Sequence, residues 1–470
     1  LGGALNVKSS DTNASLQITE GSSDGSSIIA GPLTATTTGR GNAVANIQSG
    51  TISVTDFYNA VTALAQGSGD AIVNISGNAS IEAEISKTAI LANNTGSGAA
   101  NISMTAGNVA GIVEARGIDG SIDISGGEIT GGIIAASDGG DFSISLTGGT
   151  LTYLYDVFED DDFDEVIALD VGGNGSVPHS SIYIDGATIY APANVFLSIG
   201  SDVAPVFGST NRIVVDDQLG QTFLQTALLV DVRQAGTASI EFNGGTLSYV
   251  TSNSQINAAL SAFSATEDTS VTIRDGAISA VGSPLRTPAL IGAQAVSYGN
   301  MATVSMSGGD ITVIGATAYG LMAQDFFEDG LFTEDGLQFG NSTISMTGGT
   351  LSVTAAGEEV TGNLIVDSSA IYIPANFADG ITNKITVDGG TITATNANGI
   401  LAYVNNEMTT QINLKSGYLV VNYKGRHEGY GVAVGDPTLE NRSSEPGVTT
   451  SIAIGSQMTL DASNAYYAII

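Results

Sequence analysis

Apolar and polar positions alternate along most of this chain, in a ten-residue pattern that recurs from one end to the other. The pattern is an alternating strand, a glycine corner and a second alternating strand, as in ISMTGGTLSV from Ile344. Close copies are ISLTGGTLTY from Ile144, VSMSGGDITV from Val304 and ITVDGGTITA from Ile385. Because strand side chains alternate between two faces, each copy places Ile, Leu, Val and Met on one face and small polar residues on the other.

The spacing of the copies predicts the architecture. Further copies start at Ile122, Ile182, Ile240, Val271 and Ile412, looser ones at Ala45, Val73, Ile102, Leu364 and Ile452, and the weakest near Leu16 and Ile213. The tightest intervals are 144 − 122 = 22, 364 − 344 = 20 and 385 − 364 = 21 residues, and a second class runs up to 271 − 240 = 31. A coil of about 20 residues holds three short strands and three turns.

A third apolar run follows most copies and completes the coil. Examples are GIIAA from Gly132, VIALDV from Val166, ALLVDV from Ala227, GLMA from Gly320 and GILAYV from Gly399. A β-propeller needs longer blades, the leucine-rich repeat pattern is missing, and an antiparallel sandwich does not explain so many copies of one corner. We therefore predict an all-β parallel β-helix, a solenoid of roughly 20- to 31-residue coils that continues as a single domain over residues 1–470.

Three segments interrupt the coils, and we expect them to protrude as loop insertions near residues 154–180, 320–342 and 422–450. For the first, Tyr183–Val195 (YIDGATIYAPANV) aligns with Ile365–Phe377 (IVDSSAIYIPANF). The interval before the first stretch is 182 − 144 = 38 residues, against 364 − 344 = 20 before the second, which leaves 18 extra residues around Asp156–Pro178. Loops on a rigid scaffold often carry function, so we expect the ligand-binding and partner-binding residues in these insertions.

The insertions concentrate carboxylates and aromatic rings. Oxygen-rich clusters suit calcium, the one candidate cofactor, and the candidate ligands are Asp160, Asp161, Asp162, Asp164, Glu165, Glu328 and Asp329. A solvated acidic loop explains the same residues. Aromatic side chains dominate contact energies at interfaces, which makes Tyr155, Phe158, Phe163, Phe326, Phe327 and Phe332 candidates for binding a partner. They could equally pin the loops onto the coils.

Composition narrows the function classes. The chain has 47 acidic against 13 basic residues and a net charge of −34, which disfavours nucleic acid and anionic membranes as partners. It has no Cys and no Trp, so disulfides and thiolate chemistry are excluded. No apolar run is long enough to span a bilayer as a helix. The two histidines, His179 and His427, both fall in predicted loops, and no nucleophile elbow or phosphate loop appears.

Taken together, the serial Gly-Gly-Thr coils, the acidity and the lack of Cys resemble the passenger regions of bacterial autotransporter-type adhesins and related surface β-helices. That resemblance implies a right-handed parallel β-helix, export, and adhesive loops, and it carries no site residue over. The chain starts at LGGALNV, in mid-repeat, and ends on the coil-like ASNAYYAII without a membrane barrel, so we expect a section or a cleaved part of a longer precursor.

The resulting expectation is a non-enzymatic structural and adhesive protein, extracellular and displayed on or shed from a bacterial surface. Its partners would be a protein or glycan surface, with no insertion of this segment into a membrane. Two alternatives stay open. One is a subunit of an extracellular fibre or surface layer in which copies stack end to end, and the other is a polysaccharide-degrading enzyme, which would need a pair of carboxylates at a set separation.

Overall fold

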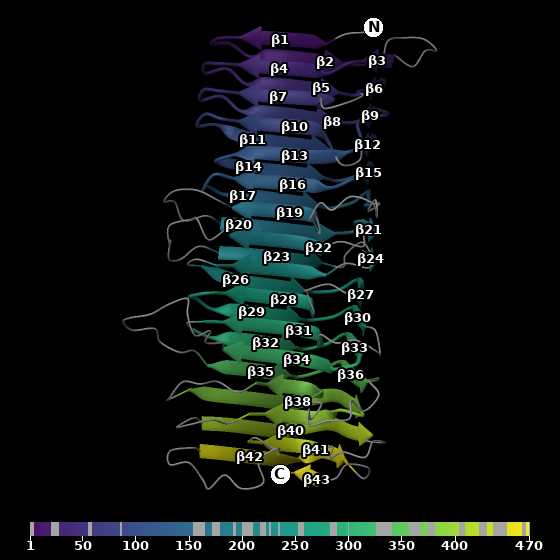
Figure 1. Ribbon diagram of the computed structural model, residues 1–470, viewed down its shortest axis with the longest axis vertical. Helices are drawn as coiled ribbons and strands as arrows, with labels where there is room; N and C mark the ends of the chain where they lie inside the picture. Colours follow the sequence, from purple (N-terminus) through teal and green to yellow (C-terminus); the bar gives the residue numbers. More distant parts are fainter. Residues whose placement is uncertain are drawn as a thin grey trace. The chain divides into compact units, whose positions relative to one another are not determined.

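A computed structural model describes most of the chain (Figure 1). The described residues are 4–19, 28–54, 59–84, 87–153, 165–171, 179–190, 194–199, 210–216, 222–224, 227–233, 236–251, 258–282, 289–298, 300–325, 341–356, 368–374, 381–403, 409–422, 430–435, 449–462 and 467–469. Every regular element among them is a β-strand, and the chain forms two compact units, Leu1–Thr226 and Ala227–Ile470. Each unit is described by itself.

In unit 1, three rows of strands repeat in chain order. The first row is β2 (Ala14–Ile18), β5 (Ala43–Ile47), β8 (Ala71–Ile75), β11 (Ala99–Met104), β14 (Asp119–Ile124), β17 (Phe142–Leu146), β20 (His179–Asp185) and β23 (Thr210–Asp216). The second is β3 (Ile28–Ala30), β6 (Thr51–Ser53), β9 (Ser80–Glu82), β12 (Asn108–Ala110), β15 (Glu128–Thr130), β18 (Thr150–Thr152), β21 (Thr188–Tyr190) and β24 (Thr222–Leu224). The third is β1 (Leu5–Ser9), β4 (Leu33–Thr37), β7 (Val61–Ala65), β10 (Thr88–Asn94), β13 (Ile112–Gly117), β16 (Ile133–Ser137), β19 (Glu165–Val171) and β22 (Asn194–Ile199).

Unit 2 repeats the same three rows. The first row is β26 (Thr237–Phe242), β29 (Thr269–Ile273), β32 (Ala302–Met306), β35 (Ser342–Met346), β38 (Thr382–Thr395), β40 (Thr409–Asn422) and β42 (Thr449–Asp461). The second is β27 (Thr246–Thr251), β30 (Ala277–Gly282), β33 (Asp310–Gly315) and β36 (Thr350–Ala355), after which β38, β40 and β42 run on through the corner. The third is β25 (Leu228–Val232), β28 (Ala258–Ser264), β31 (Leu290–Ser297), β34 (Ala318–Asp325), β37 (Ser369–Ile373), β39 (Asn398–Ala402), β41 (Tyr430–Val434) and β43 (Tyr467–Ile469).

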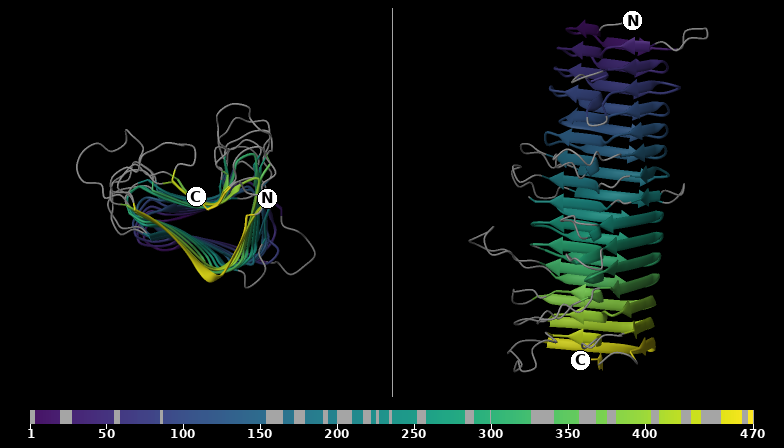
Figure 2. Two further views of the ribbon diagram at one scale, coloured as in Figure 1. Left: turned by 90° about the horizontal axis from the view of Figure 1, so that it is seen from below. Right: turned by 45° about the vertical axis from the view of Figure 1, so that its right-hand side comes forward.

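Strands of the same row pair in parallel with their counterparts in the next coil. Ile344 of β35 lies opposite Ile385 of β38, and Ile385 lies opposite Ile412 of β40. Rows one and two belong to one sheet, called here the first sheet, and row three forms the second sheet. Figure 2 shows corresponding strands at successive levels within each unit. The fold class predicted from the repeat, a parallel β-helix, is therefore confirmed.

Alternation places the apolar residues of each coil inside. In β35 the buried and partly exposed positions alternate along Ser342–Met346, and Ile344 and Met346 are fully buried. The same alternation recurs in β5, β8, β17 and β32. Both sheets contribute inward side chains to the core of each unit, so each coil is stabilised mainly by stacking its apolar residues on those of its neighbours.

Glycine is required at two places in a coil. At the corner between rows one and two, Gly349 has φ +82° and Gly309 has φ +76°, a backbone region that residues with a Cβ avoid. At the start of the second-sheet strands, the reason is space: a Cβ at Gly320 would lie 2.7 Å from Cδ1 of Leu351, and one at Gly399 would lie 2.9 Å from Cδ1 of Leu419. The third apolar runs GLMA and GILAYV begin with Gly because the two sheets approach closely there.

Most predicted copies lie in the first sheet, including the two weakest: Leu16 pairs with Ala45, and Ile182 with Ile213. The copy at Leu364 is wrong. Ile344 pairs directly with Ile385, 385 − 344 = 41 residues later, and the segment that was aligned with Tyr183–Val195 supplies β37 of the second sheet. Thr188–Tyr190 lies in the first sheet, so the two aligned stretches occupy different parts of a coil. The count of 18 extra residues in the first insertion therefore has no structural basis.

Asn and Asp side chains join successive coils just before the first-row strands. In unit 1 the Asn42 amide donates to Oδ1 of Asn13 at 2.9 Å, the Asp70 amide to Oδ1 of Asn42 at 2.9 Å, and the Ala99 amide to Oδ1 of Asp70 at 2.9 Å. Each side chain thus satisfies a backbone donor of the following coil. Much of the Asn and Asp in this part of the repeat is accounted for by stacking.

Candidate functional site

The site residues predicted from the sequence lie almost entirely outside the described residues. This holds for the candidate calcium ligands Asp160, Asp161, Asp162, Asp164, Glu328 and Asp329 and for the candidate partner-binding residues Tyr155, Phe158, Phe163, Phe326, Phe327 and Phe332. The exception is Glu165, the first residue of β19, whose backbone pairs with Asn194 of β22. The calcium and partner-binding assignments stay predictions.

The three predicted insertions share one attachment. The segment 154–180 contains β19, the segment 320–342 begins inside β34, and the segment 422–450 contains β41. All three strands belong to the second sheet of their own unit. Each insertion therefore adjoins a strand of the second sheet, whereas β17 and β18, or β35 and β36, are joined by the short glycine corners at 147–149 and 347–349.

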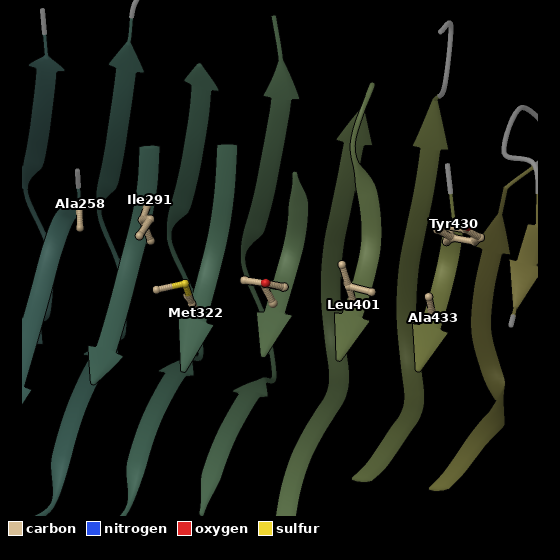
Figure 3. Close-up of a cluster of buried hydrophobic side chains, with 7 residues drawn as sticks. Ala258, Ile291, Met322, Leu401, Tyr430 and Ala433 are labelled. Carbon is tan, nitrogen blue, oxygen red and sulfur yellow. The ribbon is translucent and has the colours of Figure 1, made fainter. Parts of the chain in front are cut away.

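In unit 2, the second sheet is apolar on its outward side as well as its inward side. In β34, Leu321 and Ala323 are fully buried in the core, and Met322 between them points to the opposite side because strand side chains alternate. Met322 belongs to a separate cluster, the apolar outer face, which comprises Ala258, Ile291, Met322, Tyr372, Leu401, Tyr430 and Ala433. Figure 3 shows these side chains following one another across neighbouring strands of the sheet.

The apolar outer face is covered, since none of its seven residues is more than 9% exposed. Aromatic rings are prominent in it. The rings of Tyr319 and Tyr372 are stacked with centroids 4.6 Å apart, and Tyr403 meets Tyr372 edge to face at 6.0 Å. Tyr319 and Tyr403 pack against the cluster while staying partly exposed. Such ring pairs stabilise a packed surface beyond the area that they bury.

The outward side of the first sheet has a different character. In unit 2 its successive strands carry small polar side chains in register, such as Thr272, Ser305, Ser345 and Thr386. The Ser305 hydroxyl donates to Oγ1 of Thr272 at 3.1 Å, so neighbouring coils are linked on this face too. The two sheets of unit 2 therefore present a hydroxyl-rich face and a covered apolar face.

Unit 1 brings two carboxylates and a phenol together at the ends of β20 and β23. Asp185 lies opposite Asp216 in the parallel register, and the Tyr183 hydroxyl donates to Oδ2 of Asp216 at 3.0 Å. Burial and this hydrogen bond raise the pKa of Tyr183 to about 12. The phenol therefore stays protonated at neutral pH and acts as a hydrogen-bond donor.

A second acidic residue has an unusual setting on the outward side of β25. Nε of Arg233 donates to Oδ2 of Asp231 at 3.0 Å, while Oδ1 of Asp231 is buried without a hydrogen-bond partner among the described groups. Burial raises the pKa of the Asp231 carboxyl, and Arg233 only partly opposes this. The side chain of Arg233 is 67% exposed, so this ion pair lies at the surface of the unit.

Comparison with known protein families, with curated proteins and with solved structures finds no match to this chain. Within the described residues, no three or more His, Cys, Asp and Glu side chains are grouped so that they could hold a metal ion. In the same part of the chain, no helix is long and apolar enough to cross a membrane. Sequence reasoning missed the apolar outer face, although runs such as GLMA and GILAYV, apolar at consecutive positions, are typical of strands buried on both sides.

Proposed function

We propose that the protein is an extracellular structural and adhesive β-helix protein, displayed on or shed from a bacterial cell surface, and that it acts by binding a protein or glycan surface. The observation that carries this proposal is that all three predicted insertions adjoin the second sheet, whose outer face in unit 2 is apolar and covered. Several outward positions of the first sheet carry small hydroxyl side chains, such as Ser345 and Thr386, whereas Met322, Tyr372 and Leu401 of the second sheet are apolar and covered.

The two sheets differ in their connections and outer faces, and this difference supports the same proposal. The first sheet joins its rows mostly by short corners and links its coils through Asn, Ser and Thr side chains. These contacts hold successive coils together, as a structural scaffold requires. The second sheet adjoins every predicted insertion and carries the apolar outer face. Adhesive proteins built on repeats commonly use a rigid stack to present variable connections, and the net charge of −34 favours solubility and basic partners.

The test measures adhesion and glycan cleavage on the same protein. Beads coated with the full chain would be incubated with a glycan array and with intact cells, and soluble polysaccharides would be assayed for new reducing ends. We expect retention on one class of surface without cleavage. The matched variants are Phe326→Ser/Phe327→Ser/Phe332→Ser, in the aromatic insertion, and Ser345→Ala/Thr386→Val/Thr393→Val, on the hydroxyl-rich face.

Adhesion of the aromatic triple variant should fall at least tenfold, which corresponds to about 1.4 kcal/mol of binding free energy. Adhesion of the hydroxyl variant should stay within a factor of two of the wild-type value. Unchanged adhesion of the aromatic triple variant would locate binding elsewhere and contradict the role of the insertion. Release of reducing ends that disappears when a carboxylate pair is replaced would refute the non-enzymatic proposal and establish the polysaccharide-degrading alternative.

Calcium would act on the acidic insertions within this function. If Asp160, Asp161, Asp162, Asp164 and Glu165, or Glu328 and Asp329, gather around a calcium ion, binding stabilises the folded chain by mass action. The melting temperature of the full chain should then be higher in calcium than in chelator, and the difference should vanish when these residues are replaced by Asn and Gln. Identical melting curves in calcium and chelator would reject the site.

A further inference from the structure

A column of polar side chains lies inside unit 2, at the inward position nearest the start of three first-row strands. Ser342 opens β35, and the strand register places Asn383 of β38 directly opposite Thr410 of β40. In the same register, Ser342 lies opposite Asn383, because Thr343 pairs with Lys384. All three side chains are 0% exposed. Ser342, Asn383 and Thr410 are called here the interior polar column.

Among the described groups, no protein atom forms a hydrogen bond with the polar side-chain atoms of the interior polar column. Oγ of Ser342, Oδ1 and Nδ2 of Asn383, and Oγ1 of Thr410 are buried and form no hydrogen bond with any described group. Such atoms are rare in folded proteins, and each one left unsatisfied destabilises the native state substantially. Four of them in adjacent coils would cost an appreciable part of the whole stability of a domain, so these atoms need hydrogen-bonding partners that the described groups do not supply.

A residue at the same inward position two coils before Ser342 shows one way in which a buried hydroxyl there is satisfied. Thr269 of β29 lies opposite Ala302, and Ala302 lies opposite Ser342. The Thr269 hydroxyl is also buried, and it donates to the carbonyl oxygen of Val296 at 3.0 Å. The three later side chains lack this contact, although they occupy the equivalent position in their coils.

A larger side chain occupies the same inward position in unit 1. There β17 holds Phe142, which is 1% exposed, opposite Gly120. A Cβ at Gly120 would lie 2.6 Å from Cζ of Phe142, so the ring fits because its neighbour has no side chain. In unit 2 the position holds Ala302, Ser342, Asn383 and Thr410 in turn, which are all smaller than Phe.

The chemistry of the column selects the ligand. The set includes obligate donors, the two N–H groups of the Asn383 amide, and acceptors, its carbonyl oxygen and the two hydroxyl oxygens. It contains no charged group. The ligand must therefore be small and neutral and must both donate and accept, which a cation or an anion cannot do.

We propose that ordered water molecules bind inside unit 2 along the interior polar column and connect Ser342, Asn383 and Thr410. One water accepts from Nδ2 of Asn383, and water O–H groups donate to Oδ1 of Asn383 and to the two hydroxyl oxygens. Buried waters with several polar partners are an integral part of many folded proteins and exchange slowly with bulk solvent.

The experiment counts long-lived internal waters in the full chain by oxygen-17 magnetic relaxation dispersion. The test variant is Ser342→Ala/Asn383→Leu/Thr410→Val, and the control is Ser345→Ala/Asn413→Leu/Thr386→Val, which makes the same three changes at partly exposed outward positions of the same strands. We expect the test variant to lose one or more long-lived waters and the control to lose none. Should the triple variant fail to fold, Ser342→Ala and Thr410→Val would be measured singly.

A crystal structure of the full chain gives the second readout. We expect solvent density within hydrogen-bonding distance of Asn383. Direct hydrogen bonds from the Asn383 amide to Ser342 and Thr410, with no solvent between the coils, would overturn the proposal in favour of a side-chain ladder. An unchanged number of long-lived waters in the test variant would overturn it as well.

Discussion

The glycine corner of the coil that starts at Ser342 offers a sharp test of the fold, because its two adjacent glycines are needed for different reasons. A Cβ at Gly348 would lie 2.4 Å from the carbonyl oxygen of Ser307, and one at Gly349 would lie 2.5 Å from that of Gly309. The nearest contact with the preceding coil is therefore similar at both positions, and a Cβ at Gly349 would also lie 2.6 Å from Cε of Met306, the movable end of a flexible side chain. Only Gly349 also has a positive φ, +82°.

Replacement of each glycine by alanine separates the cost of the steric contact from the cost of the left-handed backbone. Forcing a Cβ against the preceding coil should cost about 1–3 kcal/mol at either position. The left-handed backbone adds about 1–2 kcal/mol for Gly349→Ala alone. The gain from restricting the unfolded chain, about 0.4–1 kcal/mol, applies to both variants and cancels in their comparison. Gly349→Ala should therefore be less stable than Gly348→Ala by about 1–2 kcal/mol.

The assay is hydrogen exchange of the full chain followed by mass spectrometry, read on peptides that cover β35 and β36, together with urea unfolding. Exchange reports the local opening free energy of this coil, which matters because repeat proteins can open locally. Equal protection in the two variants would refute the reasoning that backbone conformation, and not contact alone, dictates the second glycine. Wild-type protection in both would refute the close approach of the coils.

Three further changes test individual side chains. In Tyr183→Phe, the group with a pKa of about 12 should disappear from the alkaline absorbance titration, and loss of a group that titrates near 10 would contradict the assignment. The contribution of Tyr183 to stability should be lost as the pH rises from about 10 to about 12, because the folded state holds the phenol proton more tightly than the unfolded state. Asp231→Asn should raise the free energy of unfolding, measured in urea at neutral pH, by about 1 kcal/mol or less and by less in acid, since burial raises the pKa of that carboxyl; a lowered free energy of unfolding would show that the bond from Arg233 outweighs burial. Phe142→Ala should destabilise unit 1 by about 3–5 kcal/mol in urea unfolding, because its ring is 1% exposed, and a loss below about 1 kcal/mol would mean that the coil collapses around the cavity.

Period-two alternation in the sequence predicts which side chains face the core, but it does not say which sheet a strand joins. The prediction succeeded at Ile344 and Ile385, where the Gly-Gly corner identifies rows one and two of a coil. It failed at Ser369–Ile373, because SAIYI is apolar at four consecutive positions and so does not alternate, while the following Pro-Ala-Asn resembled that after Tyr190. Pairing with Tyr319 and Leu321 of β34, a strand about 50 residues earlier in the sequence, assigns Ser369–Ile373 to the second sheet, and pairing is a tertiary property.

The candidate sites were harder to predict for a different reason. Carboxylates and aromatic residues in the insertions attract attention because their types are unusual for this chain, whereas the apolar outer face uses the same Leu, Met and Ala as the core. Its signal is position: Met322 and Leu401 are apolar at outward points where Ser and Thr are usual. The interior polar column carries the reverse signal, because Asn383 and Thr410 are polar at inward points where Ala and Ile are usual.

These two departures from alternation have different consequences for the protein. An apolar residue that faces outward is favourable only if something covers it, so the outer face of the second sheet couples the coils to whatever packs on them. A polar residue that faces inward is tolerated only if it is hydrogen-bonded, so the interior polar column requires bound water or a side-chain ladder. Changing Met322 should therefore disturb binding and the cover of the sheet, while changing Asn383 should disturb internal hydration and leave binding intact. Because the two positions lie on adjacent sheets of the same unit, variants at both would separate the adhesive role of the protein from the stability of its scaffold.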